Sequence, residues 1–239
     1  MQNMDKRTSD NLLKLVKTSY NQIAEDFNIT RQKPIWPELI KITKNIDDSL
    51  VHKNVLDVGC GNGRLAELFS GRNISYLGVD NCANLLHLAK TNYQPNTFAE
   101  GDILELSQVP GHNFDYVFCV AVLHHLPGTR LRLEALKQLK SKIKPGGTII
   151  LTNWNLWSQK KFRRLIAKFF FLKLLGKHKM DFGDIIFNWH GSDGAPGSER
   201  YYHAFTNREL KKLVKLSELK LEQLYHDKYN YYLIIKKPL

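Results

Sequence analysis

A glycine-rich loop is the segment of this sequence best suited to hold a small ligand. Gly59 and Gly61 lie in the run Asp57-Val58-Gly59-Cys60-Gly61-Asn62-Gly63, which directly follows a short apolar stretch. Glycine lets the backbone turn tightly and approach a ligand where a β-carbon would clash. A helix expected after the loop would offer unpaired N–H groups and a partial positive charge, which suit a carboxylate. Dinucleotide-binding proteins and ordinary tight turns share such a loop, so the loop alone does not identify the ligand.

Acidic and histidine side chains follow the next three apolar stretches. Asp80 stands about 20 residues beyond the loop, where an acid can accept hydrogen bonds from both hydroxyls of a ribose. Its alternative role is to cap the next helix. Asp102 and Ile103 come after the third stretch, where an acid can bind an adenine amino group, and His124 and His125 follow the fourth. Because open α/β sheets bind ligands at the carboxyl ends of their strands, these positions predict one shared site.

Short apolar runs alternate with helical patterns through the middle of the chain. We expect strands at residues 55–58, 76–79, 97–99, 114–120 and 148–152, helices at 64–69, 82–90 and 129–143, and a turn at 144–147. Strands separated by helices favour parallel pairing with right-handed crossovers. The sequence therefore predicts a doubly wound, mostly parallel α/β sheet.

The two ends of the chain are expected to pack against this sheet. Apolar residues recur at helical spacing from Leu12 to Phe27, and Pro37 opens a second helix that continues to Ile46. Thr206 and Glu209 form a capping box for a helix over 207–216, and the runs 219–225 and 231–235 predict a closing β-hairpin. We expect one domain over residues 1–239, built of an N-terminal helical cap (1–50), a ligand-binding core (54–152), a basic insert (153–200) and a C-terminal helix with a β-hairpin (201–239).

The insert concentrates basic and aromatic residues. Its first half, 157–179, alternates Lys and Arg with Phe, Leu and Ile, and the glycine-rich run 191–198 predicts a mobile loop. The basic half fits contact with nucleic-acid phosphates, an amphipathic helix on an anionic membrane, or a solvated helix whose apolar face packs on the domain. We expect packing with some phosphate contact, because the apolar residues are too numerous to remain exposed.

The overall composition narrows the class of protein and its partners. Lys and Arg (35) outnumber Asp and Glu (23), and this formal net charge of +12 favours a polyanionic partner, either nucleic acid or an acidic membrane surface. We expect nucleic acid rather than a membrane, because the basic excess is concentrated in the insert. Cys60, Cys82 and Cys119 have no Cys-x-x-Cys spacing, and no apolar run is long enough to span a bilayer. No pair of histidines has the helical spacing of metal ligands. We therefore expect a cytoplasmic protein without a metal site.

These segments together resemble the class I S-adenosylmethionine-dependent methyltransferases. The matching runs are the glycine loop, Gly78-Val79-Asp80, Gly101-Asp102, Phe114-Asp115-Tyr116-Val117 and Lys144-Pro145-Gly146-Gly147-Thr148. The resemblance implies a Rossmann-like seven-stranded sheet with an antiparallel seventh strand, and S-adenosyl-L-methionine as the cofactor. It also implies cofactor contacts by Tyr20, Arg31, Trp36, Asp57, Gly59, Gly61, Asp80, Asn81, Asp102, Ile103, Val120 and Ala121.

A narrower resemblance extends over most of the chain. The runs 20–27, 30–37, 122–125, 153–155 and 200–205 are similar to segments of the tRNA wobble-uridine (5-carboxymethyluridine) carboxyl methyltransferases. This similarity implies tRNA as the substrate, and relatives in some lineages work with a small activating protein. The segment 160–198 matches least. The alternatives are methylation of a small molecule, such as a quinone precursor or a lipid-like acceptor, and a cofactor-binding scaffold without activity.

The chemistry implied by that family requires orientation more than proton transfer. A carboxylate is ionised near neutral pH, so it needs no general base to attack a methyl carbon. Arg31 and Arg200 are candidates for a cationic fork on the carboxylate, and His124 for a residue at the methyl-transfer site. A purely structural role is the alternative for each of the three. Tyr20 and Trp36 are expected either to close over the cofactor or to fill the core.

Overall fold

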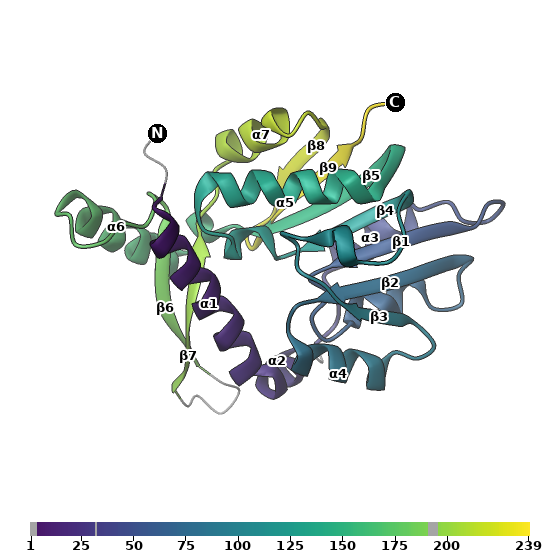
Figure 1. Cartoon of the computed structure of the whole chain (residues 1–239), viewed down its shortest axis with the longest axis horizontal. Helices are drawn as coiled ribbons and strands as arrows, with labels where there is room; N and C mark the ends of the chain where they lie inside the picture. The colour runs from purple at the N-terminus through teal and green to yellow at the C-terminus, as the bar shows by residue number, and fades with distance from the viewer. Residues whose placement is uncertain (1–3, 32, 191–195) are drawn as a thin grey trace.

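The chain folds around one seven-stranded sheet (Figure 1). The computed structural model describes residues 4–31, 33–190 and 196–239. The strands of this sheet are β1 (Lys53–Val58), β2 (Ile74–Asp80), β3 (Thr97–Glu100), β4 (Phe114–Val120), β5 (Ile143–Trp154), β8 (Lys220–His226) and β9 (Asn230–Lys236). They lie in the order β3-β2-β1-β4-β5-β9-β8, and β9 runs antiparallel to both neighbours while the other pairs are parallel. The predicted fold class is confirmed.

Helices cover both faces of the sheet. The elements α3 (Pro37–Lys44), η1 (Arg64–Phe69) and α4 (Ala83–Asn92) lie on one face, and α5 (Gly128–Lys142) and α7 (Asn207–Leu216) lie on the other. Successive side chains of a strand point to opposite faces, so each central strand contributes to two cores. In β1, Val55 packs with the first group, whereas Leu56 and Val58 pack with α5 and α7. This arrangement explains the nearly continuous apolar runs of the central strands.

Two local predictions differ from the structure. The segment 64–69 is a 3₁₀-helix and not an α-helix, beginning with an i→i+3 bond from the Ala66 N–H to the Gly63 carbonyl. The predicted turn at 144–147 lies within the irregular start of β5. Its backbone stays in the sheet because the Gly146 N–H donates to the Lys237 carbonyl and the Lys237 N–H donates to the Gly147 carbonyl.

The insert contains a structural unit that the sequence did not predict. After α6 (Lys160–Leu174), the strands β6 (Asp184–His190) and β7 (Pro196–His203) form a separate antiparallel pair. The predicted loop at 191–198 is wrong for residues 196–198, which belong to β7, and residues 191–195 lie outside the described part of the chain. One face of the pair packs Ile185 and Tyr202 against α6, and the other packs Tyr201 against Leu12 of α1 (Lys6–Gln22). Figure 1 shows this stacking of α6, the strand pair and α1.

The helix α6 is only partly packed. Phe162 and Ile166 in its first half are buried against the strand pair, as expected. Phe170, Phe171 and Leu174 in its second half are 43%, 62% and 60% exposed. The expectation that the whole apolar face is covered is therefore wrong for the second half of α6. Among the helices of the described residues, none is long and apolar enough to cross a bilayer.

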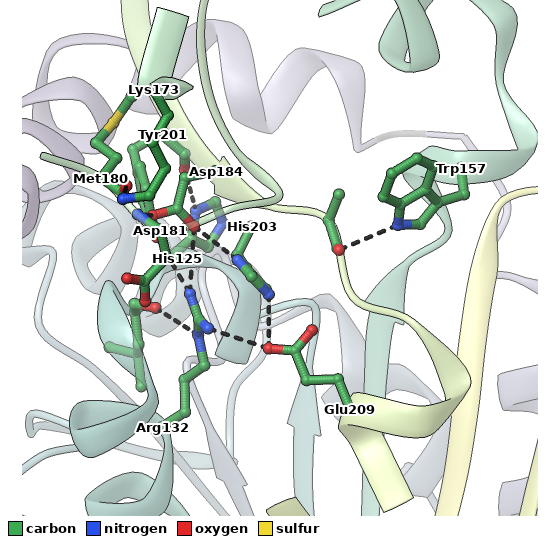
Figure 2. Close-up of polar contacts among 12 residues, drawn as sticks. His125, Arg132, Trp157, Lys173, Met180, Asp181, Asp184, Tyr201, His203 and Glu209 are labelled. Atoms are coloured by element: carbon green, nitrogen blue, oxygen red, sulfur yellow. Dashed lines mark hydrogen bonds and ion pairs between the residues drawn. The ribbon is translucent and has the colours of Figure 1, made fainter. Parts of the chain in front are cut away.

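The insert is joined to the core by a buried network of charged side chains (Figure 2). The Nη2 atom of Arg132 in α5 lies 3.4 Å from Oδ1 of Asp184 in β6, and Nη1 lies 3.3 Å from Oε1 of Glu209 in α7. His203 of β7 bridges the same two carboxylates, with Nδ1 2.6 Å from Asp184 and Nε2 2.9 Å from Glu209. The hydroxyl of Tyr201 donates to Asp184 at 2.8 Å. Two cations and two carboxylates thus balance, with Arg132, His203 and Asp184 buried and the Glu209 side chain 30% exposed.

The protonation of His203 follows from this geometry. Burial and the charge of Arg132 both act to lower the pKa of His203. The hydrogen bonds to Asp184 and Glu209 outweigh them and hold the pKa above its ordinary value, because both ring nitrogens face carboxylate oxygens and must donate. Glu209 is also the residue of the predicted capping box. Its N–H donates to Thr206 at 3.2 Å as expected, but its carboxylate binds Arg132 and His203.

Candidate functional site

A cavity of about 850 Å³ lies at the carboxyl ends of the parallel strands. The loops that follow β1 to β5 form its floor, and α1, α2 (Ala24–Thr30) and the start of α3 form its roof. All of the residues predicted to contact the cofactor line this cavity, namely Tyr20, Arg31, Trp36, Asp57, Gly59, Gly61, Asp80, Asn81, Asp102, Ile103, Val120 and Ala121. Residues separated by more than a hundred positions in the sequence are thus brought to one chamber.

The glycine loop is held against β2 by its backbone. The N–H of Gly59 donates to the Val79 carbonyl at 2.8 Å, and Gly59 has a φ of 77°, which favours glycine. A β-carbon at Gly59 would lie 2.3 Å from Cγ2 of Val122. Gly61, with a φ of 58°, donates its N–H to Oδ2 of Asp80 at 2.8 Å. The loop is therefore wedged between β2 and the segment that follows β4.

The two acids predicted to bind the ligand are fixed in orientation. Asp80 accepts backbone N–H bonds from Gly61 at 2.8 Å and from Cys82 at 2.9 Å, one on each carboxylate oxygen. Burial raises the pKa of Asp80 even though these bonds oppose the shift. Asp102 accepts from the Leu104 N–H and from the Asn81 side chain. A carboxylate has about four acceptor positions, so each acid keeps capacity for a ligand hydroxyl or amine.

Asp57 is a buried carboxyl group with an incomplete set of partners. It accepts a 2.7 Å hydrogen bond from the Tyr76 hydroxyl on Oδ2, whereas Oδ1 has no partner among the described residues. Burial raises the pKa of Asp57 to about 7, against the opposing effect of the Tyr76 bond. A cationic ligand group, such as an ammonium, placed in the cavity beside Oδ1 would stabilise the ionised form.

This raised pKa predicts a pH dependence of folding stability. Between about pH 4 and pH 7 the folded chain binds a proton at Asp57 that the unfolded chain has lost, so the free energy of unfolding falls as pH rises. Asp57→Asn keeps an acceptor for Tyr76 and removes this titration. We expect the difference in unfolding free energy, variant minus wild type, to rise by about 2–4 kcal/mol from about pH 4 to about pH 7. Urea unfolding of both chains without cofactor measures it, and parallel pH curves would contradict the assignment.

His125 positions Tyr20 at the roof of the cavity. Its Nδ1 lies 3.3 Å from the Tyr201 carbonyl oxygen, which can only accept, so Nδ1 carries the hydrogen. Burial and the charge of Arg200 lower the pKa of His125 to about 3, so the ring is neutral. Its Nε2 therefore accepts the hydrogen bond from the Tyr20 hydroxyl, 2.9 Å away. Through Tyr201, this contact connects the cavity to the buried charge network.

His124, the histidine predicted for the methyl-transfer site, also lines the cavity. Its ring centroid lies 5.7 Å from that of Trp154 and 5.0 Å from that of Tyr202. Burial and the neighbouring His125 hold the pKa of His124 well below its usual range. Both histidines are therefore neutral at physiological pH and add no charge to the site.

The two candidate arginines occupy different positions. Arg31 lines the cavity, with its guanidinium carbon 4.5 Å from the Phe27 ring centroid. Arg200 does not line it. The Arg200 guanidinium lies behind Tyr20, 5.0 Å from that ring centroid and 4.4 Å from that of Trp189. A direct contact between Arg200 and a ligand in the cavity therefore requires Tyr20 to move.

Neither arginine has an acidic partner among the ion pairs of the described residues. Burial lowers the pKa of Arg31, and the positive charge of Arg200 acts in the same direction. Arg200 is 3% exposed and donates from Nη1 to the Tyr202 hydroxyl, while Nε and Nη2 lack partners among the described residues. Among the described residues, no carboxylate pairs with either positive charge of this part of the site, which favours an anionic ligand.

Sequence reasoning missed four contributors to the site. His125 was grouped with His124, but it is His125 that holds Tyr20. Phe27 covers Gly61, and Val122 packs on Gly59. Lys17 lines the roof from α1. The signal for Lys17 was its place in the helical pattern near Tyr20, whereas the contacts of Phe27 and Val122 depend on tertiary packing alone.

Comparison with known proteins identifies the family. Residues 56–151 match the family model of the methyltransferase domain. The chain is 31% identical over 196 residues to a protein of Encephalitozoon cuniculi provisionally named as a methyltransferase, and the match covers 80% of each chain. The chain belongs to the S-adenosylmethionine-dependent methyltransferases. Its methyl donor is S-adenosylmethionine, whose sulfonium group supplies an electrophilic methyl carbon.

Other relatives of this methyltransferase act on different acceptors. The tRNA (carboxymethyluridine(34)-5-O)-methyltransferase of Schizosaccharomyces pombe is 28% identical over 225 residues, which cover 91% of this chain and 94% of the relative. The ubiquinone biosynthesis O-methyltransferase of Acinetobacter baumannii is 30% identical over 142 residues, which cover 57% of this chain and 59% of the relative.

Solved structures of low sequence identity share the fold. A S-adenosylmethionine-dependent methyltransferase of Methanosarcina mazei superposes with a TM-score of 0.67 at 20% identity, covering 87% of this methyltransferase and 100% of that chain. A Haloferax volcanii methyltransferase, solved in complex with the Trm112 methyltransferase activator, superposes with a TM-score of 0.63 at 13% identity, covering 94% and 98%.

Proposed function

We propose that this methyltransferase converts the carboxylate of a 5-carboxymethyl-modified wobble uridine in tRNA into its methyl ester. The observation that carries the proposal is the extent of the match to the Schizosaccharomyces pombe tRNA enzyme. It spans 91% of the chain and therefore includes most of the N-terminal and C-terminal residues that the core match at 56–151 leaves out. Among these outer segments, α1, α2 and the start of α3 form the roof of the cavity, where we expect an acceptor to approach.

The cavity suggests how the methyl donor is held. We assign Gly59 and Gly61 to the methionine moiety, whose ammonium would partner the free Oδ1 of Asp57. Asp80 would accept from the ribose hydroxyls, and Asp102 with Ile103 would hold the adenine. Asn81, Val120, Ala121, Tyr20, Arg31 and Trp36 complete the proposed contacts. The donor then lies across the carboxyl ends of the strands, as ligands of open α/β sheets do.

The proposed reaction needs an oriented carboxylate and a dry chamber. A carboxylate oxygen forms a bond to the methyl carbon as the bond from carbon to sulfonium sulfur breaks, which yields the methyl ester and the neutral thioether of S-adenosylhomocysteine. No proton moves in this step, which agrees with the neutral state of His124 and His125. Arg31 and Arg200, which form no ion pair within the described part of the chain, favour binding of the acceptor carboxylate on the roof side.

Mass spectrometry of tRNA nucleosides tests the acceptor directly. Purified protein with S-adenosylmethionine is incubated with tRNA that carries the carboxymethyl uridine, and the digested nucleosides are analysed. We expect the mass of one methyl group to be added at that uridine. Unchanged nucleosides, in a preparation that binds the donor in calorimetry, would refute the tRNA assignment.

Arg31 provides a sharper test of carboxylate binding. We expect Arg31→Met to lower kcat/KM for the carboxymethyl tRNA by about 10- to 100-fold, because a charge-assisted hydrogen bond contributes roughly 1.5–3 kcal/mol. Arg31→Lys should retain part of the activity, since it keeps the charge but not the bidentate geometry. The donor Kd, measured by calorimetry, serves as the control. Because Arg31 is also a proposed donor contact, a donor Kd that weakens as much as kcat/KM falls would account for the whole loss and refute its role on the acceptor carboxylate.

Methylation of a small molecule is the second candidate, favoured by the similarity to the ubiquinone biosynthesis enzyme. Salt dependence separates the two. Methylation of tRNA should weaken steeply as salt rises, because phosphate contacts release counterions. Methylation of a neutral quinone precursor should change little over the same range.

The proposal also includes a small activating protein as a partner and the cytoplasm as the site of action. The Haloferax volcanii neighbour was solved with its activator, and we propose that this chain uses a partner of that kind. Activity of the isolated chain equal to that with the added activator would count against it. The three cysteines are buried and unbridged, which agrees with action in the reducing cytoplasm.

A further inference from the structure

The end of the insert helix exposes a cluster of large apolar side chains. We define the apolar tip as Phe170, Phe171, Leu174, Leu175 and Phe182, which are 43%, 62%, 60%, 69% and 50% exposed. The ring centroid of Phe170 lies 5.6 Å from that of Phe171 and 5.1 Å from that of Phe182, so the aromatic part is continuous. Exposing such a cluster to water is unfavourable in free energy, and exposed apolar patches of this kind mark sites of interaction.

Basic residues flank the apolar tip. The solvent-facing side of α6 carries Arg163, Arg164 and Lys168, all before the apolar tip, and Lys177 is exposed just after the helix. We call these four residues the basic collar. The sequence from residue 160 to 180 contains no Asp or Glu. The exposed side of α6 therefore changes along its length from cationic to apolar.

The position of α6 makes this end accessible. Figure 1 shows α6 at one extremity of the molecule, beyond the strand pair β6–β7 and away from the seven-stranded sheet. Phe162 and Ile166 anchor its first half on that pair. The apolar tip thus projects from a helix that is already fixed to the fold, and the cofactor cavity contains none of its residues.

Charge and apolar surface distinguish three candidate partners for the exposed side of α6: a second copy of the chain, nucleic acid and a lipid surface. A second copy of the chain would bring two basic collars together, and like charges repel. Nucleic acid would compensate the collar, but its phosphates offer no cover for the aliphatic Leu174 and Leu175. An anionic lipid surface satisfies both parts, since acyl chains take up Phe and Leu while headgroup charges bind Lys and Arg.

We infer that the tip of α6 docks this methyltransferase on an anionic lipid surface, with the apolar tip inserted at the headgroup boundary and the basic collar on the headgroups. The inference goes beyond the proposed tRNA methylation and does not rest on it. In Figure 1, β6–β7 and α1 lie between α6 and the sheet whose strand ends form the cavity. Docking by α6 therefore leaves the cavity open to an acceptor.

Vesicle co-sedimentation tests the inference with the full-length chain. The probes are vesicles of phosphatidylcholine alone and of phosphatidylcholine with roughly one third phosphatidylserine. We expect binding to the anionic vesicles, and a fall in the partition coefficient of at least about tenfold for Phe171→Ser/Leu174→Ser/Leu175→Ser. Lys168→Gln/Lys177→Gln should also weaken binding, and high salt should weaken that of the wild type.

A matched control changes equally exposed apolar residues elsewhere. Leu50→Ser/Val51→Ser/Leu216→Ser alters side chains that are 90%, 61% and 53% exposed but lie far from α6 in the sequence. Its vesicle binding should equal that of the wild type. Far-UV circular dichroism and donor affinity, unchanged in all variants, establish that each is folded.

Four results would overturn the inference. They are no wild-type binding to anionic vesicles, equal loss of binding in the tip variant and in the control, binding of tRNA but not of vesicles through the tip, and a solution dimer that the tip variant dissolves. Methylation of free tRNA by the tip variant should equal that of the wild type, so a failure here is distinguishable from a failure of the proposed function.

Discussion

Replacing Asp184 with asparagine is expected to lower the free energy of unfolding by about 3–5 kcal/mol, because breaking a buried ion network leaves an uncompensated charge. The Asp184 side chain is fully buried, and those of Arg132 and His203 are 1% and 3% exposed. Asp184→Asn leaves Glu209 as the direct ion-pair partner of both cations within the described residues, and Asp181 acts on Arg132 only through its charge. The loss would be a large fraction of the stability of a typical domain. Urea unfolding near neutral pH measures it.

The pH dependence of the same variant checks the mechanism. Burial acts to raise the pKa of Asp184, but the hydrogen bond and charge of His203, with Arg132, hold it below the ordinary value. Its contribution is therefore present above the pKa of an unfolded aspartate and is lost as pH falls through the lower, folded value. We expect the difference between wild type and Asp184→Asn to shrink in acid.

An exposed ion pair supplies the control for this prediction. Lys140 lies 3.0 Å from Glu218, whose side chain is 85% exposed. Glu218→Gln should change the free energy of unfolding by less than about 1 kcal/mol, because water screens such pairs. If Asp184→Asn were as mild as Glu218→Gln, the network would contribute little to docking of the insert.

Gly59→Ala should weaken donor binding by about 10- to 100-fold, the equivalent of roughly 1.4–2.8 kcal/mol. The added β-carbon would lie 2.3 Å from Cγ2 of Val122, and a φ of 77° is strained for alanine. Val122 is β-branched and cannot rotate away freely, so the loop itself must shift. The expected shift displaces the backbone on which the methionine moiety is proposed to lie. Calorimetric titration with S-adenosylmethionine gives the change in Kd.

Gly71→Ala separates backbone strain from the clash. Gly71 has a φ of 71°, but a β-carbon there meets nothing within 4 Å. Its replacement should destabilise the fold by about 1 kcal/mol and leave the donor Kd unchanged. Wild-type affinity in Gly59→Ala would show that the contact of the loop with Val122 does not shape the site.

The elements that could be predicted from sequence are those fixed by local patterns. The strand β4 begins at Phe114 and ends at Val120, as expected from its apolar run. The helix α7 begins after Thr206 because that hydroxyl accepts the Glu209 N–H, a local interaction with a local signature. Asp80 and Asp102 could also be predicted, because each lies at or just after the end of a recognisable strand and parallel strands bring their carboxyl ends to one edge of the sheet.

The parts that sequence reasoning missed depend on contacts between distant residues. The glycine-rich run 191–198 predicts only a loop, because the contacts that stabilise β6 and β7 come from α6 on one face and from α1 on the other. The carboxylate of Glu209 was predicted to cap α7, but it binds His203 and, far away in the sequence, Arg132. Which histidine holds Tyr20 depends on side-chain directions in the 3₁₀ turn Leu123–His125, and spacing does not encode them.

The composite origin of the cavity has a consequence for donor turnover. Apart from Trp154, its floor comes from the segment that matches the methyltransferase family model, whereas its roof comes from α1 to α3, outside that match. A fragment reduced to residues 56–151 would keep the strand-end loops but leave one side of the donor open to water. Parting of the roof would expose that side and speed release of spent S-adenosylhomocysteine, and α1 is anchored to the insert through Leu12 and Tyr201. The exchange rate of the product is thus tied to the same outer segments that face the acceptor.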